Sequence, residues 1–113
     1  MKVIYHVDEM AKWPLTLTNV SNMLAVYKQQ GEAYEIEVLA NSAAVKQYAQ
    51  ADELEAKMAA LAKEGILFTA CGNALKANQL KAEELYPFVE VVSAGVVVEL
   101  AKRQAEGYAY IKP

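Results

Sequence analysis

The sequence contains few of the residues that support disulfide, metal or nucleic-acid chemistry. Its 113 residues include one cysteine, Cys71, and one histidine, His6, so neither an internal disulfide nor a closed zinc site is expected. The formal net charge is −3 and the lysines are scattered among glutamates, which leaves no basic stripe for nucleic acid. No apolar run is long enough for a membrane span, and the first residues do not form a secretory signal. We therefore expect one domain in a reducing, cytoplasmic setting, without metal, membrane or nucleic acid.

Three motifs of nucleotide and ester chemistry are also missing. The chain has no G-x-G-x-x-G, no G-x-x-x-x-G-K and no G-x-S-x-G. A dinucleotide fold, a P-loop and a serine esterase elbow each depend on one of these motifs. We therefore predict no cofactor.

What the chain does contain is a regular alternation of strand and helix patterns. Short apolar or alternating segments predict five strands, at residues 3–7, 34–40, 66–70, 89–92 and 108–111. Between them, apolar residues at helical spacing predict helices at about 12–31, 52–61, 72–77 and 95–106, with an irregular helix at 43–48 and a turn at 83–86. This alternation is typical of an α/β domain with a mostly parallel sheet and right-handed crossovers.

Several residues predict where the helices begin and end. Pro14 suits a first helical turn, where its missing N–H does no harm, and Gly31 suits a helix end. Asp52 and Glu55 have the spacing of a capping box. Ser93 is expected to cap the last helix.

Polar residues follow the predicted strands at the points where those strands end. They are His6 with Asp8 and Glu9, then Asn41 with Ser42, then Cys71 with Gly72 and Asn73, and finally Ser93 with Gly95. Because the carboxyl ends of parallel strands meet at one edge of a sheet, we expect these residues to share that edge. A thiol, an imidazole and amides near helix N-termini are suited to stabilise an anion or to activate a sulfur atom.

Cys71 is the strongest candidate among them. It follows a buried strand and precedes a helix that begins at Gly72, and a helix N-terminus favours a thiolate over a thiol. This predicts an accessible, reactive cysteine. The alternative is that Cys71 is an inert core residue and that His6 is satisfied by local backbone or by Asp8. In that case Asn41, Asn73 and Ser93 are turn and cap residues that bond nearby backbone.

Several segments of the chain resemble the DsrE/DsrF-like family. They are residues 6–9 (HVDE), residues 12–14 (KWP), Asn19, Asn22, residues 70–76 (ACGNALK) and the tail at 104–113 (QAEGYAYIKP). The likeness covers almost the whole chain, which implies a single domain at residues 1–113. It further implies a three-layer α/β/α sandwich with a five-stranded, mainly parallel sheet, assembled as a homo-oligomer, often a trimer or hexamer.

The resemblance also implies a chemistry. Family members linked to sulfur metabolism carry sulfane sulfur on a cysteine and pass it to a partner, and Cys71 matches that cysteine by position. At residue 74, where the family commonly has a serine, this chain has alanine. Loss of that hydroxyl would weaken stabilisation of an anion or persulfide.

Two functional hypotheses follow. In the first, the protein is a sulfur carrier in which Cys71 forms a persulfide, Gly72, Asn73, Asn41 and Ser93 stabilise it, and His6 transfers a proton. Its partners would be a sulfur donor or acceptor protein, or a small thiol. In the second, it is a non-catalytic homo-oligomeric module that binds a small anion or nucleotide at the same edge.

Two further expectations concern surface and core. Val96, Val97 and Val98 place apolar residues around more of a helix than one core-facing stripe uses, and Tyr108 and Tyr110 add aromatic surface, which predicts an oligomer. Trp13, beside Pro14, is expected to be a packing anchor.

Overall fold

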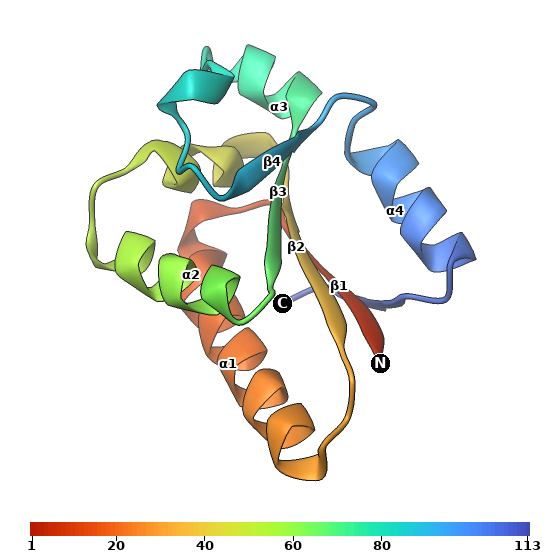
Figure 1. The fold of residues 1–113 in the computed structure, drawn as a ribbon. Helices are drawn as coiled ribbons and strands as arrows, with labels where there is room; N and C mark the ends of the chain where they lie inside the picture. The colour runs from red at the N-terminus through yellow and green to blue at the C-terminus, as the bar shows by residue number, and fades with distance from the viewer.

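Five parallel strands form the centre of the structure, a computed structural model that describes residues 1–113 (Figure 1). The strands are β1 (Lys2–Val7), β2 (Glu35–Ala40), β3 (Leu67–Cys71), β4 (Val89–Val92) and β5 (Ala109–Ile111). Their order across the sheet is β4-β3-β2-β1-β5, and every neighbouring pair is parallel. The predicted parallel sheet is confirmed.

The helices form the outer layers. They are α1 (Trp13–Gln30), α2 (Glu53–Lys63), α3 (Gly72–Ala77) and α4 (Val96–Ala105), with 3₁₀ segments η1 (Met10–Lys12), η2 (Ser42–Ala49) and η3 (Ala82–Glu84). Strands β1 to β4 follow one another in one direction, whereas β5 returns to the far side of β1. Right-handed crossovers therefore place α1 and α2 on one face of the sheet and α4 on the other, as Figure 1 shows. The three-layer prediction is confirmed, and no helix is long and apolar enough to span a membrane.

The helix ends agree with the sequence signals in part. Pro14 lies in the first turn of α1, and Gly31 ends that helix with a φ of 66° in the left-handed region. The side chain of Asp52 accepts a hydrogen bond from the N–H of Leu54 at 3.0 Å, so the predicted N-cap of α2 is confirmed. The capping box is wrong, because the side chain of Glu55 makes no return bond to Asp52.

The predicted cap of α4 is also wrong. The N-cap is Gly95, not Ser93, because the chain turns tightly after β4 and the N–H of Gly95 donates to the carbonyl of Val92 at 3.2 Å. This turn places Gly95 at a φ of 95°, a conformation that glycine adopts far more readily than other residues. Ser93 is thereby left outside the helix.

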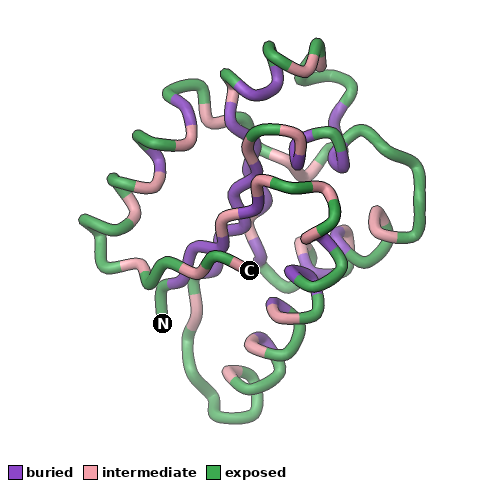
Figure 2. Tube along the Cα trace, turned by 180° about the vertical axis from the view of Figure 1, so that it is seen from behind, coloured by how far each residue is buried: buried purple, intermediate pink, exposed green.

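The main hydrophobic core lies between the sheet and the layer formed by α1 and α2. Alternate side chains of the strands point into it, among them Val3, Tyr5, Val38 and Phe68. Figure 2 shows that the buried residues are concentrated in the strands and on the helix flanks that face them. Burial on this scale is the main favourable contribution to folding.

Trp13 is completely buried in this core. Its ring packs edge-on against Tyr48 with the centroids 5.3 Å apart. Its indole N–H donates to the carbonyl of Ala44 at 2.9 Å. The side chain thus joins the start of α1 to η2, as expected of a packing anchor.

The opposite face of the sheet is joined to α4 by polar side chains. We call Glu37, Thr69, Glu99 and Arg103 the Glu37 cluster; Glu37 is 1% exposed. Arg103 donates from Nε to Glu37 at 2.8 Å and to Glu99 at 3.1 Å. Thr69 donates its hydroxyl to the second oxygen of Glu37 at 2.8 Å. Glu99 is the only buried residue of α4, so this helix lacks a buried apolar stripe.

Burial and the neighbouring carboxyl of Glu99 raise the pKa of Glu37 to about 7, against the opposing effects of Thr69 and Arg103. Burial alone would lower the pKa of Arg103, but the carboxylates around it raise that pKa above its ordinary value. The remaining titratable groups around Arg103 are Glu106, whose carboxylate accepts at 3.2 Å, and the ring of Tyr108 at 5.0 Å. On the other side of the sheet, burial and then Glu37 raise the pKa of Tyr48.

Candidate functional site

Cys71 lies at the carboxyl edge of the sheet, as the last residue of β3 and the N-cap of α3. Strand alternation places its side chain on the same face as Thr69, the face that α4 covers. Gly95 lies over the sulfur, since a Cβ at that position would be 4.0 Å from Sγ. Cys71 is therefore only 3% exposed, and the prediction of an accessible thiol is wrong for the sulfur as it stands in this structure.

A pocket of about 330 Å³ nevertheless opens beside Cys71. Nine residues from three segments line it: Asn41, Ser42, Cys71, Asn73, Ala74, Ala94, Gly95, Val96 and Val97. Three of the predicted site residues, Cys71, Asn41 and Asn73, are thus brought together. Their side chains provide one thiol and two carboxamides in a concave and otherwise largely apolar surface.

Gly72 and Ser93 lie in a neighbouring pocket of about 230 Å³, together with Lys76 of α3. The start of α3 packs closely against the end of β4, because a Cβ on Gly72 would lie 3.2 Å from the carbonyl oxygen of Val92. The structure therefore assigns Gly72 a close backbone approach. It does not bring Ser93 into the pocket of Cys71.

His6 contacts Asn41 but does not itself line the Cys71 pocket. Its Nε2 is 2.9 Å from Oδ1 of Asn41, and its Nδ1 is 2.7 Å from the hydroxyl of Tyr110. Both ring nitrogens therefore have partners. The sequence did not reveal the contact with Tyr110, because it depends on β5 lying beside β1, and no sequence signal shows which strands are neighbours.

The two acidic residues after β1 have other roles. Asp8 accepts from Lys112 at 2.9 Å, and this hydrogen bond lowers the pKa of Asp8. The pair joins the end of β1 to the tail that follows β5. Glu9 is the N-cap residue of η1 and makes no side-chain capping bond.

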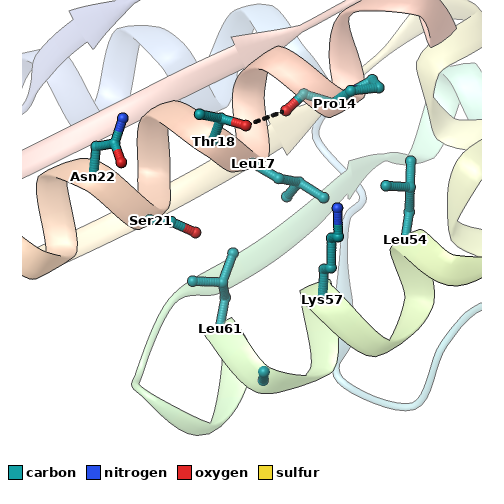
Figure 3. A pocket seen from close by; sticks show the side chains of 9 residues that line it. Pro14, Leu17, Thr18, Ser21, Asn22, Leu54, Lys57 and Leu61 are labelled. Carbon is teal, nitrogen blue, oxygen red and sulfur yellow. Dashed lines mark hydrogen bonds between the residues drawn. The ribbon is translucent and has the colours of Figure 1, made fainter.

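A larger pocket of about 390 Å³ lies between α1 and α2 (Figure 3). These two helices cover the face of the sheet opposite to α4 (Figure 1). Leu17, Leu54 and Leu61 are its main apolar residues, and Lys57 and Asn22 add polar groups. It contains no thiol or imidazole. The chemistry predicted from the sequence therefore belongs to the smaller pocket beside Cys71.

Comparison with known proteins gives one family and one fold. The model of the DsrE/DsrF-like family matches residues 10–113. A solved protein of unknown function from Methanobacterium thermoautotrophicum, MTH1491, is 33% identical, with a TM-score of 0.88 over 99% of this chain and 98% of its own. No protein of curated function matches the chain.

Two more distant solved structures share the fold. The YchN protein of E. coli is 13% identical, with a TM-score of 0.73 over 100% of this chain and 99% of its own. The protein BT1422 of unknown function from Bacteroides thetaiotaomicron is 15% identical, with a TM-score of 0.77 over 99% of this chain and 94% of its own. At these identities the likeness concerns the fold alone.

Proposed function

This chain belongs to the DsrE/DsrF-like family, a family associated with sulfur relay, and on that premise we propose that it carries a sulfur atom as a persulfide on Cys71. The observation that carries the proposal is that its only cysteine lines a pocket together with Asn41 and Asn73. Carboxamide N–H groups are suitable donors for an anionic sulfur.

The transfer step conserves electrons. The Cys71 thiolate attacks the outer sulfur of a donor persulfide R–S–SH, the donor S–S bond breaks, and R–S⁻ leaves. A new S–S bond forms on Sγ, which gives Cys71–S–SH. Attack by an acceptor thiolate on the outer sulfur reverses the same exchange and releases the Cys71 thiolate.

A small donor suits the pocket better than a bulky one. Cys71 is 3% exposed and lines the pocket of about 330 Å³, so we take that pocket as the route to the sulfur. Polysulfide or a low-molecular-weight persulfide fits within that volume. With one cysteine per chain, an external thiol must complete the cycle, and free thiols are characteristic of a reducing, cytoplasmic compartment.

We also propose that the protein is a homo-oligomer, as a trimer or hexamer. Val97 and Val98 of α4 are 75% and 55% exposed, and Val91 and Tyr110 are also exposed. Contiguous exposed apolar side chains, such as the neighbouring Val97 and Val98, mark interaction surfaces, and aromatic side chains such as Tyr110 are enriched at subunit interfaces. Val97 also lines the Cys71 pocket, so an interface on α4 would adjoin the site.

Mass spectrometry under anaerobic conditions tests the sulfur-carrier proposal. After exposure to polysulfide, the native protein should gain the mass of one or more sulfur atoms, and dithiothreitol should remove them. Cys71→Ser should gain none. Absence of any gain in the wild-type protein would refute the proposal.

A second candidate function is a non-catalytic module that binds a small anion in the same pocket. It is favoured by the burial of Cys71 beside two carboxamides that line the pocket. Binding of thiosulfate, measured by calorimetry, should then persist in Cys71→Ser while no sulfur is ever carried. If Cys71→Ser loses both thiosulfate binding and the gain of sulfur, the result would support the sulfur-carrier function.

A further inference from the structure

A chain of two hydrogen bonds joins the tail of the molecule to the Cys71 pocket. The hydroxyl of Tyr110 in β5 is 2.7 Å from Nδ1 of His6 in β1. Nε2 of His6 is 2.9 Å from Oδ1 of Asn41, which follows β2. Asn41 lines the pocket, whereas His6 and Tyr110 do not. The three side chains come from residues up to 104 positions apart.

The donors and acceptors of this chain fix one another. Oδ1 of Asn41 can only accept, so Nε2 of His6 carries the proton and donates to it. In the neutral imidazole, Nδ1 is then an acceptor, and the hydroxyl of Tyr110 donates to it. The carbonyl oxygen of the Asn41 carboxamide therefore accepts its hydrogen bond from His6.

This arrangement leaves one group free. The Nδ2 amide group of Asn41 has no hydrogen-bond partner within the chain, although every buried side-chain nitrogen and oxygen has one. It therefore lies where water or a ligand can reach it, on a residue of the pocket wall. An amide N–H group is a donor and suits an anion.

We propose that Tyr110 and His6 are positioning residues that hold the Asn41 carboxamide with its N–H group available to an anionic ligand beside Cys71. The inference rests on the proposed sulfur-carrier function and gives it a substrate class, namely anionic sulfur species such as polysulfide. It also replaces the role of His6 in proton transfer with an indirect one, because both ring nitrogens are engaged away from the thiol.

Paired alkylating reagents test the inference. Iodoacetate and iodoacetamide react with the same sulfur and have nearly the same size, but only iodoacetate is anionic. The ratio of their rates at Cys71 therefore measures anion preference independently of folding and access. Tyr110→Phe and His6→Phe should lower that ratio about threefold, and Asn41→Leu about tenfold, the loss expected for a hydrogen bond to a charged group.

Tyr108→Phe is the matched control. Tyr108 also lies in the C-terminal region, but its hydroxyl is 3.4 Å from Arg103 and has no contact with His6. The ratio in this variant should equal that of the wild-type protein. A purely structural role of Tyr110 would change both rates together and leave the ratio unchanged, which would overturn the inference.

Failure of the inference is distinguishable from failure of the proposed function. If the wild-type protein gains sulfur from polysulfide but Tyr110→Phe leaves the rate ratio unchanged, the sulfur-carrier function stands and the positioning role is refuted. If the wild-type protein gains no sulfur but Tyr110→Phe still lowers the ratio, the sulfur-carrier function is refuted and an anion site beside Cys71 stands. No reaction of native Cys71 with either reagent would overturn the inference, because the pocket would then not lead to the sulfur.

Discussion

The two helical layers of this molecule are held to the sheet by different forces. Helix α1 buries five side chains, four of them apolar: Trp13, Thr16, Leu17, Val20 and Leu24. Helix α4 buries Glu99 alone, and the Glu37 cluster connects it to the strands. Apolar packing depends little on pH or salt, whereas a cluster of charges depends on both. We call the side of the sheet covered by α1 the robust side, because its packing depends little on pH and salt. We call the side covered by α4 the conditional side, because its attachment to the sheet depends on both.

The candidate site lies on the conditional side. Gly95, which covers the sulfur of Cys71, is the N-cap of α4, and the N–H of Glu99 donates to its carbonyl at 3.1 Å. Glu99 in turn belongs to the Glu37 cluster. Regions with few buried apolar contacts open at lower free energy than the core. Changes that loosen α4 should therefore expose Cys71, whereas changes on the side of α1 should mainly alter global stability.

The largest effect is expected for Trp13→Ala. Loss of a fully buried indole, together with its bond to Ala44, should lower the free energy of unfolding by about 3–5 kcal/mol. Chemical denaturation measures this change. Under native conditions the alkylation rate of Cys71 should stay close to that of the wild type. Leu15→Ala is the control, because Leu15 is 48% exposed on the same helix and its loss should cost little. A rate change without loss of stability would place Trp13 in the site.

A smaller effect is expected for Arg103→Met on the opposite layer. This change leaves the buried carboxyl of Glu37 without its cation and should cost about 3 kcal/mol. It should also accelerate alkylation of Cys71, because α4 would be held less firmly. Lys28→Met is the matched control: its ion pair with Glu64 is similarly short, at 2.8 Å, but exposed to solvent, so that its loss should change the free energy of unfolding far less. Equal costs for the two variants would contradict the comparison.

The next prediction concerns pH. The pKa of Glu37 is raised from 4.5 to about 7 on folding, so between these values the folded state binds more protons than the unfolded state. The free energy of unfolding should therefore fall as pH rises from about 4.5 to about 7, by on the order of 2–3 kcal/mol, and this contribution should be absent above that range. Urea denaturation across this range measures it.

Glu37→Gln should remove most of this slope, because glutamine keeps the size of the side chain and does not titrate. Glu35→Gln provides the control, since Glu35 lies in the same strand but is exposed. A wild-type stability that rises with pH over the range would contradict the assignment. Hydrogen exchange of the α4 amides, corrected for intrinsic rates, should show the same dependence on pH.

The sequence predicted the apolar part of the molecule well. The strand and helix periods, Pro14, Gly31 and the cap at Asp52 act locally, and the structure agrees with each of them. The polar residues at the strand ends also indicated where Cys71, Asn41 and Asn73 meet, because parallel strands bring their carboxyl ends to one edge.

What the sequence could not reveal depends on contacts between distant segments. Cys71 is buried because Gly95, 24 residues later in the chain, lies over its sulfur. The Nδ1 atom of His6 is hydrogen-bonded because β5 brings Tyr110 beside it. Glu37 has the alternation of a solvated strand face. Its burial arises only because the crossover to β5 lays α4 over it.

The smallest effect on stability, and a large one on assembly, is expected for Val97→Asp. Val97 is 75% exposed, so the charge should alter the free energy of unfolding of a single chain by less than about 0.5 kcal/mol. If α4 forms the subunit interface, the same charge would be buried without a partner, and light scattering should detect a species near 12.4 kDa in place of an oligomer. Val26→Asp is the control, because Val26 is 45% exposed on α1. If Val26→Asp dissociates the oligomer and Val97→Asp does not, the subunit interface lies on α1, on the robust side of the molecule, and not on α4.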